Sequence, residues 1–186
     1  MAPMPQGRHG SSARRAKPRT AEEPPSFGEL CVLGRVPGHG APKAALQRLL
    51  ACYLHALGLP AASVTLKLVG EAASQRLNRQ WRAIDASTDV LSFPGLDGKP
   101  PKGFDGHLGD LALCLPYAWR KRRRFAPRFG AECAFLTLHG LLHLCGRHHD
   151  TPAQEREMWR LSRRLHPLGA GLFGALDKLA PEGARP

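Results

Sequence analysis

The sequence lacks any run of about 18 apolar residues, the length that a membrane-spanning helix needs. It also lacks a short apolar segment behind its basic N-terminus, as a secretory signal would have, so we expect a cytoplasmic protein. Acidic residues are scarce, with 15 Asp and Glu against 27 Lys and Arg, which gives a formal net charge of +12. A balance this basic favours polyanionic partners such as nucleic acid.

Cysteines are also few, and their arrangement excludes a disulfide scaffold. The five residues are odd in number, far apart and form no C-x-x-C pair: Cys31, Cys52, Cys114, Cys133 and Cys145. This pattern is typical of a reducing compartment. The chain has no internal repeat.

The chain divides into one domain between two tails. Residues 1–26 are polar, basic and Pro-rich, and they offer little apolar surface to offset the entropy of ordering, so we predict a disordered tail. Residues 27–168 form the domain, and we expect residues 169–186 to be a flexible C-terminal tail.

Within the domain, segments in which apolar residues alternate with polar ones, as in strands, are interspersed with segments in which apolar residues recur every three or four positions, as in helices. The predicted strands are Leu30–Leu33, Ser63–Val69, Val90–Phe93 and Leu108–Leu115. The predicted helices are Pro42–Leu57, Glu71–Trp81, Tyr117–Phe125, Arg128–Cys145 and Pro152–Leu165. Two consecutive strands joined by the Gly- and Pro-rich loop 95–106 indicate an antiparallel pair. We therefore predict an α+β fold with one small mixed sheet of about four strands and about five helices.

The helix at 128–145 is the most apolar of the chain, and it carries two histidines. His139 and His143 are four residues apart, so their imidazoles share one face and can bind one metal ion. Gly146 allows the chain to turn back and bring His149 to the same ion. Three protein ligands leave one position open, which is typical of catalytic zinc. We predict one Zn²⁺ per chain on His139, His143 and His149, with this helix central in the fold.

Two alternatives bear on this site. His148 is a rival for His149 as the third ligand, and the spacing does not decide between them. The spacing of the three histidines also matches a class of zinc peptidases, but those enzymes carry a glutamate where Gly140 stands here. A peptidase mechanism would therefore lack its general base.

A cluster of basic residues precedes the central helix. Arg120, Lys121, Arg122, Arg123 and Arg124 follow one another, with Trp119 and Phe125 on either side. Such a patch can neutralise phosphates while its aromatic rings stack on unpaired bases. We predict that Arg120, Arg122, Arg123 and Arg124 bind RNA, although a solvated helix face would have the same composition.

Three blocks of sequence resemble the YbeY family of ribosomal-RNA maturation endoribonucleases. His139-Gly140-Leu141-Leu142-His143 with Gly146 and His149 is similar to the family's histidine signature. Asn78-Arg79-Gln80-Trp81-Arg82 and Thr88-Asp89-Val90-Leu91-Ser92-Phe93-Pro94 resemble a second block, and Leu108-Gly109-Asp110 a third. The likeness covers roughly residues 29–166. One departure is His148, which stands where the family usually has Asp.

The resemblance implies a zinc-dependent, single-strand-specific endoribonuclease in 16S rRNA 3′-end maturation and late-stage ribosome quality control, acting with ribosomal components. It also implies that Arg82 pairs with the scissile phosphate as the catalytic cation. Thr88, Asp89 and His148 are candidate pocket residues, although a local Asx or ST turn would explain the first two equally well. The alternative function is a zinc-containing RNA-binding ribosome assembly factor with little catalysis of its own.

Overall fold

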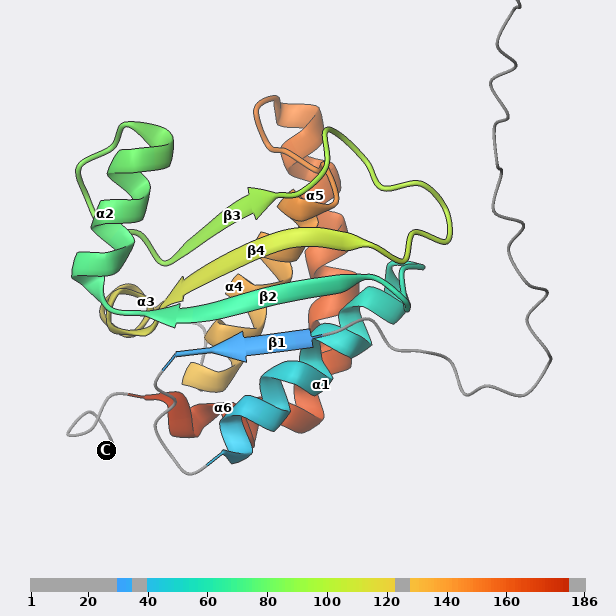
Figure 1. Ribbon diagram of the computed structural model, residues 1–186. Helices are drawn as coiled ribbons and strands as arrows, with labels where there is room; N and C mark the ends of the chain where they lie inside the picture. The colour runs from blue at the N-terminus through green and yellow to red at the C-terminus, as the bar shows by residue number, and fades with distance from the viewer. Residues whose placement is uncertain (1–29, 35–39, 123–127, 181–186) are drawn as a thin grey trace, which may run out of the picture.

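A single mixed sheet organises the chain (Figure 1). The computed structural model describes residues 30–34, 40–122 and 128–180. Its strands are β1 (Leu30–Leu33), β2 (Ser63–Val69), β3 (Val90–Pro94) and β4 (His107–Cys114). They lie in the order β1-β2-β4-β3, where β1, β2 and β4 are parallel and β3 is antiparallel to β4. The predicted α+β class, the four strands and the antiparallel pair are confirmed.

Helices cover mainly one face of this sheet. They are α1 (Ala41–Ala56), α2 (Glu71–Arg82), α3 (Leu115–Lys121), α4 (Phe129–Leu144), α5 (Pro152–Leu165) and α6 (Phe173–Leu176), with 3₁₀ segments at His166–Leu172 and Asp177–Leu179. In Figure 1, α1 and α4 lie behind the sheet, and α2 stands beside one end of it. One face of strand β2 is therefore buried and the other is more open to solvent: Val64, Leu66 and Leu68 are buried, while Lys67 is exposed. This is the period-two pattern expected of a half-buried strand. No described helix is long and apolar enough to cross a membrane.

Helix α4 is the most deeply buried helix in the described structure. Its buried residues include Leu138, Leu141, Leu142 and Leu144, none of which exposes measurable surface. The helix contacts β3 and β4 on the sheet and α1, α5 and α6 on its other sides. A helix held on several sides can fix its polar side chains firmly, because a packed core resists displacement.

Gly140 sets how closely α4 approaches the sheet. A Cβ atom at this position would come within 2.8 Å of Leu111 Cδ2, 3.2 Å of Ser92 Oγ and 3.2 Å of Val90 Cγ2. The Ser92 hydroxyl also donates a hydrogen bond of 3.1 Å to the Gly140 carbonyl. A larger residue at this position, such as the glutamate of a zinc peptidase, would force neighbouring side chains to move, so glycine permits the close approach.

We expect Gly140→Val to lower the free energy of unfolding by about 2 kcal/mol or more, because overpacking a close helix–sheet contact typically costs about 1–3 kcal/mol. Thermal and urea unfolding would measure the loss. Gly171→Val is a matched control, since a Cβ atom there meets nothing within 4 Å. Equal stability of the two variants would contradict the close approach.

The segment after α5 differs from the sequence-based expectation. Residues 169–186 were predicted to be flexible, yet residues 169–179 are helical and Leu176 and Leu179 are fully buried. The Gly130 N–H donates a hydrogen bond of 2.8 Å to the Asp177 carboxylate, which ties this segment to the start of α4. The folded domain therefore extends to residue 180, and the predicted boundary at 168 falls within a packed segment. The predicted tail at 1–26 and residues 181–186 lie outside the described residues.

Candidate metal centre

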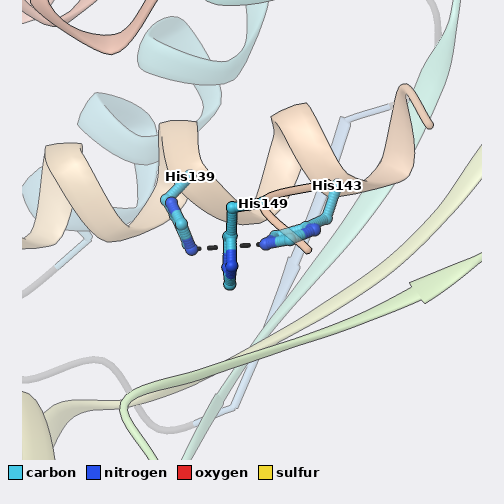
Figure 2. Close-up of side chains that lie close together, drawn as sticks. All are labelled: His139, His143 and His149. Carbon is cyan, nitrogen blue, oxygen red and sulfur yellow. Dashed lines mark hydrogen bonds between the residues drawn. The ribbon is translucent and has the colours of Figure 1, made fainter. Parts of the chain in front are cut away.

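Two histidines project from the same face of α4 toward a third from the turn that follows (Figure 2). His139 and His143 are each partly buried, and their Nε2 atoms lie 3.3 Å apart. This distance follows from their spacing of four residues on the helix. The predicted pairing of the two imidazoles is therefore present in the structure.

The turn at the end of α4 brings the third histidine back. Gly146 has a φ of +67°, a left-handed conformation that glycine adopts without strain. Its N–H donates to the His143 carbonyl at 2.9 Å, and the Arg147 N–H donates to the Leu142 carbonyl at 3.0 Å, which together form a Schellman motif. A Cβ atom on Gly146 would lie 2.6 Å from the backbone of Gly98, so the position requires glycine for space as well.

His149 completes a group of three donors that could hold one metal ion. Single ring nitrogens of His139, His143 and His149 all lie within 4.8 Å of one another. The rival His148 lies outside this group, with its ring centroid 5.8 Å from that of His143. The donor set is all imidazole, a set that suits zinc and other borderline metals.

The electrostatic surroundings of His143 suit it to bind a cation. Burial, together with the neighbouring His139 and His149, lowers the pKa of His143 to about 4 from an ordinary value of 6.5. The positive charge of Arg82 acts in the same direction. His143 is consequently neutral at physiological pH, which leaves a ring lone pair for coordination.

The histidines open into a cavity of about 730 Å³. This volume is in the range of small-molecule and nucleotide sites. The cavity is lined by side chains of α2, β3, α4, α5 and the segments next to them. These include Arg82, Thr88, Asp89, Val90, Ser92, Glu132, Phe135, His139, His143, His148, His149, Asp150, Glu155, Met158, Trp159 and Ser162.

Arg82 reaches the cavity from the last turn of α2. The C-cap of the helix is Ala83, which has a left-handed backbone with a φ of 57°. Asn78 Nδ2 donates a hydrogen bond of 2.8 Å to the Ala86 carbonyl and anchors the loop that follows. Arg82 is exposed, and within the described part of the chain it forms no ion pair. The neighbouring Arg79 instead faces Asp85 at 3.9 Å. Among the described residues, the acidic partner on this turn of α2 belongs to Arg79 and not to Arg82.

Thr88 and Asp89 line the cavity and also make local hydrogen bonds, although not the bond to the N–H two residues on that defines an Asx turn. Asp89 Oδ1 accepts a hydrogen bond from the Val90 N–H at 2.7 Å and one from the Thr88 hydroxyl at 3.2 Å. The Thr88 backbone is held by Ser74, whose hydroxyl donates 2.9 Å to the Thr88 carbonyl. These contacts hold the backbone that leads into β3 beside the cavity, and a contact of either side chain with the substrate stays a prediction.

The predicted basic patch is only partly described, and its described arginines do not line the cavity. Arg120 forms an ion pair with Glu71, and the guanidinium of Arg122 lies 3.8 Å from the centroid of the Trp119 ring. Helix α3 ends at Lys121, earlier than predicted, and Arg123 and Arg124 lie outside the described residues. Lys121 is the one cation of this patch that lines the cavity among the described residues.

Sequence reasoning missed the aromatic and acidic side of the cavity. Glu132 and Phe135 precede His139 by seven and four residues, so helical spacing from the histidines could have located them. Trp159 comes from α5 and stacks on Phe135 with centroids 5.9 Å apart. No local signal in the sequence places α5 next to α4, and Trp159 could not have been found in this way.

Comparison with known proteins identifies the family. A family model described as endoribonuclease YbeY matches residues 40–167, more than half of the chain. The chain belongs to the YbeY family. Its sequence is 43% identical over 125 residues to an endoribonuclease YbeY from Anaeromyxobacter sp. (strain Fw109-5), and 41% identical over 115 residues to one from Myxococcus xanthus. The resemblance read from the sequence blocks is thereby confirmed.

The matches to YbeY relatives cover a part of each protein. The first spans 67% of this chain and 63% of the Anaeromyxobacter protein, and the second 61% of this chain and 38% of the Myxococcus protein. A solution structure of a Thermotoga maritima protein superposes with a TM-score of 0.57 at 24% identity, covering 85% of this chain and all of that one. This structural likeness supports the fold of the YbeY chain described here.

Proposed function

We propose that this chain is a zinc-dependent endoribonuclease that hydrolyses single-stranded RNA. The observation that carries the proposal is the position of His139, His143 and His149 in the same cavity as Arg82. Metal-assisted phosphodiester hydrolysis uses a Lewis acid together with a cation that stabilises the negative charge developing on the phosphate, and the cavity has residues suited to both roles. The relatives named endoribonuclease YbeY and the net charge of +12 support an RNA substrate.

The three histidines would hold the ion, and Arg82 would hold the phosphate. When bound, zinc supplies Lewis acidity to a phosphoryl oxygen and to an attacking water. The guanidinium of Arg82 donates two parallel hydrogen bonds to phosphate oxygens and stabilises their charge as the bond breaks. Asn78 and Ser74 anchor the loop between α2 and β3 to helix α2, which keeps the backbone near Thr88 in a fixed position relative to the helix that carries Arg82. His148 lines the same cavity and would contact the substrate rather than the ion.

The biological substrate that we propose is ribosomal RNA in the cytoplasm. The activity would serve maturation of the 16S rRNA 3′ end and late-stage ribosome quality control, in contact with ribosomal components. The support for this finer statement is membership of the YbeY family together with the basic charge.

We expect the purified protein to cleave a labelled single-stranded RNA, and to lose this activity after treatment with a chelator because the histidines then lack their ion. Added Zn²⁺ should restore cleavage. A blunt duplex of the same sequence is the control and should stay intact. If the protein binds the single strand with any metal added but never cleaves it, the RNA-binding assembly factor replaces the enzyme as the proposed function.

A further inference from the structure

The solvent side of α5 presents a row of arginines. Arg156, Arg160, Arg163 and Arg164 are all exposed, and within the described part of the chain none of them forms an ion pair. Of the two glutamates on this helix, Glu157 pairs with Arg147 and Glu155 lines the cavity. The positive charge of the row is therefore not neutralised by its own helix.

Trp159 lies between this row and the cavity. On a helix, residues three and four apart are neighbours, so Arg156 and Arg163 flank Trp159 at spacings of −3 and +4. Arg160 adjoins these two arginines, four residues after Arg156 and three before Arg163. Trp159 lines the cavity and keeps 36% of its surface exposed. We call Arg156, Trp159, Arg160 and Arg163 the α5 stripe.

The ring of Trp159 is supported from the side of the metal centre. It stacks on Phe135 at an interplanar angle of 25°, and Phe135 stacks on His139 at 22° with centroids 6.0 Å apart. Capping box contacts between Thr151 and Gln154 fix the start of α5, and Met158 and Leu165 anchor its buried side. An indole held in this way offers a rigid surface at little entropic cost.

We propose that the α5 stripe binds the segment of single-stranded RNA that leaves the cavity, with a base stacked on Trp159 and adjacent phosphates on Arg156 and Arg163. The inference rests on the proposed function, because it takes RNA as the occupant of the cavity. An aromatic ring among cations is the arrangement by which proteins bind single strands without reading their sequence. Continuity with the cavity favours RNA over a protein partner, since one strand can reach both places.

The test is equilibrium binding of a single strand that the protein does not cleave. We would use a fluorescent RNA of about 12 nucleotides, within the usual footprint of such surfaces, with a 2′-O-methyl phosphorothioate backbone, and titrate it at several salt concentrations. We expect Trp159→Ala to weaken binding about tenfold with an unchanged salt slope, because stacking is not ionic. Trp159→Phe should restore most of the affinity.

Neutralising the arginines, unlike removing the indole, should change the dependence of binding on salt. We expect Arg156→Gln with Arg163→Gln to weaken binding and to reduce the slope of log K against log salt by about 1.4, since each phosphate contact with a single strand contributes about 0.7. The matched control is Lys43→Gln with Arg48→Gln on α1, which removes two exposed charges elsewhere and should change affinity less than about twofold.

The outcomes separate this inference from the proposed function. The first outcome is that the α5 variants bind RNA as well as the control pair does while wild type cleaves ordinary RNA. This result would overturn the inference, and the α5 stripe would then be a candidate surface for a protein partner. If the α5 variants lose RNA binding but wild type cleaves no RNA, the result supports RNA binding by the α5 stripe and contradicts the proposed endoribonuclease activity. Absence of RNA binding by wild type would overturn both.

Discussion

Replacing His143 by alanine is expected to reduce RNA cleavage by a factor of roughly 10³ or more, equivalent to about 4 kcal/mol of transition-state stabilisation. The substitution leaves two imidazoles where the structure has three within 4.8 Å, and two donors hold zinc far more weakly than three. The fold should persist, because the side chain is only partly buried on a helix whose leucines supply the packing.

Two measurements on the same preparation would test this expectation: cleavage of a labelled single-stranded RNA and the zinc content of the purified protein. His148→Ala is the matched control, because His148 lines the same cavity but lies outside the group of three donors. That variant should retain its zinc, whereas His149→Ala should lose it. A His143→Ala protein that keeps both zinc and activity would remove the metal centre from the mechanism.

Arg82→Gln is expected to lower kcat/KM for RNA by about 10²–10³, the usual cost of deleting one group that stabilises charge in a transition state. Glutamine retains hydrogen-bonding capacity but loses the charge and the forked geometry of the guanidinium. Zinc content should be unchanged, because Arg82 is not a donor. Arg82→Lys should recover only part of the rate, since an ammonium group does not bind a phosphate through two parallel hydrogen bonds.

The neighbouring Arg79 supplies the control for Arg82. It lies on the same turn of α2 with similar exposure, yet it faces Asp85 and does not line the cavity. Arg79→Gln should therefore change kcat/KM by less than about threefold, as expected for an exposed ion pair. If Arg79→Gln and Arg82→Gln have equal effects, the loss reflects overall charge and not contact with the scissile phosphate.

Much of the fold and the grouping of the three histidines could be predicted because the signals are local. Helical spacing placed His139 beside His143, and Gly146 marked the turn before His149, all within one short stretch. Helix α5 has the predicted bounds, since Thr151 supplies an N-cap and Pro152 the first turn. Each of these features depends on residues within a few positions of one another.

The features that were missed depend on contacts between distant parts of the chain. Residues 169–180 are rich in glycine and alanine and look like a tail, and they fold because Leu176 and Leu179 pack against the domain. Arg120 pairs with Glu71, which is 49 residues away in the sequence. Trp159 reaches the cavity only because α5 returns beside α4. Contacts between residues so far apart cannot be read from a short stretch of the sequence.

The compactness of the histidine group in the sequence has a consequence for folding order. His139 lies on α4, and His149 follows ten positions later, after the Schellman turn that ends this helix. Bringing the histidines together therefore requires only a short loop of chain. Arg82 lies 57 positions before His139, and its place beside the histidines depends on the pairing of β3 with β4 and on the packing of α4 against them. Short-range contacts form faster than long-range strand pairing, because less chain entropy is lost. During synthesis and refolding the protein should therefore acquire its capacity to bind metal before its capacity to position RNA, and hydrolysis should be the last property to appear.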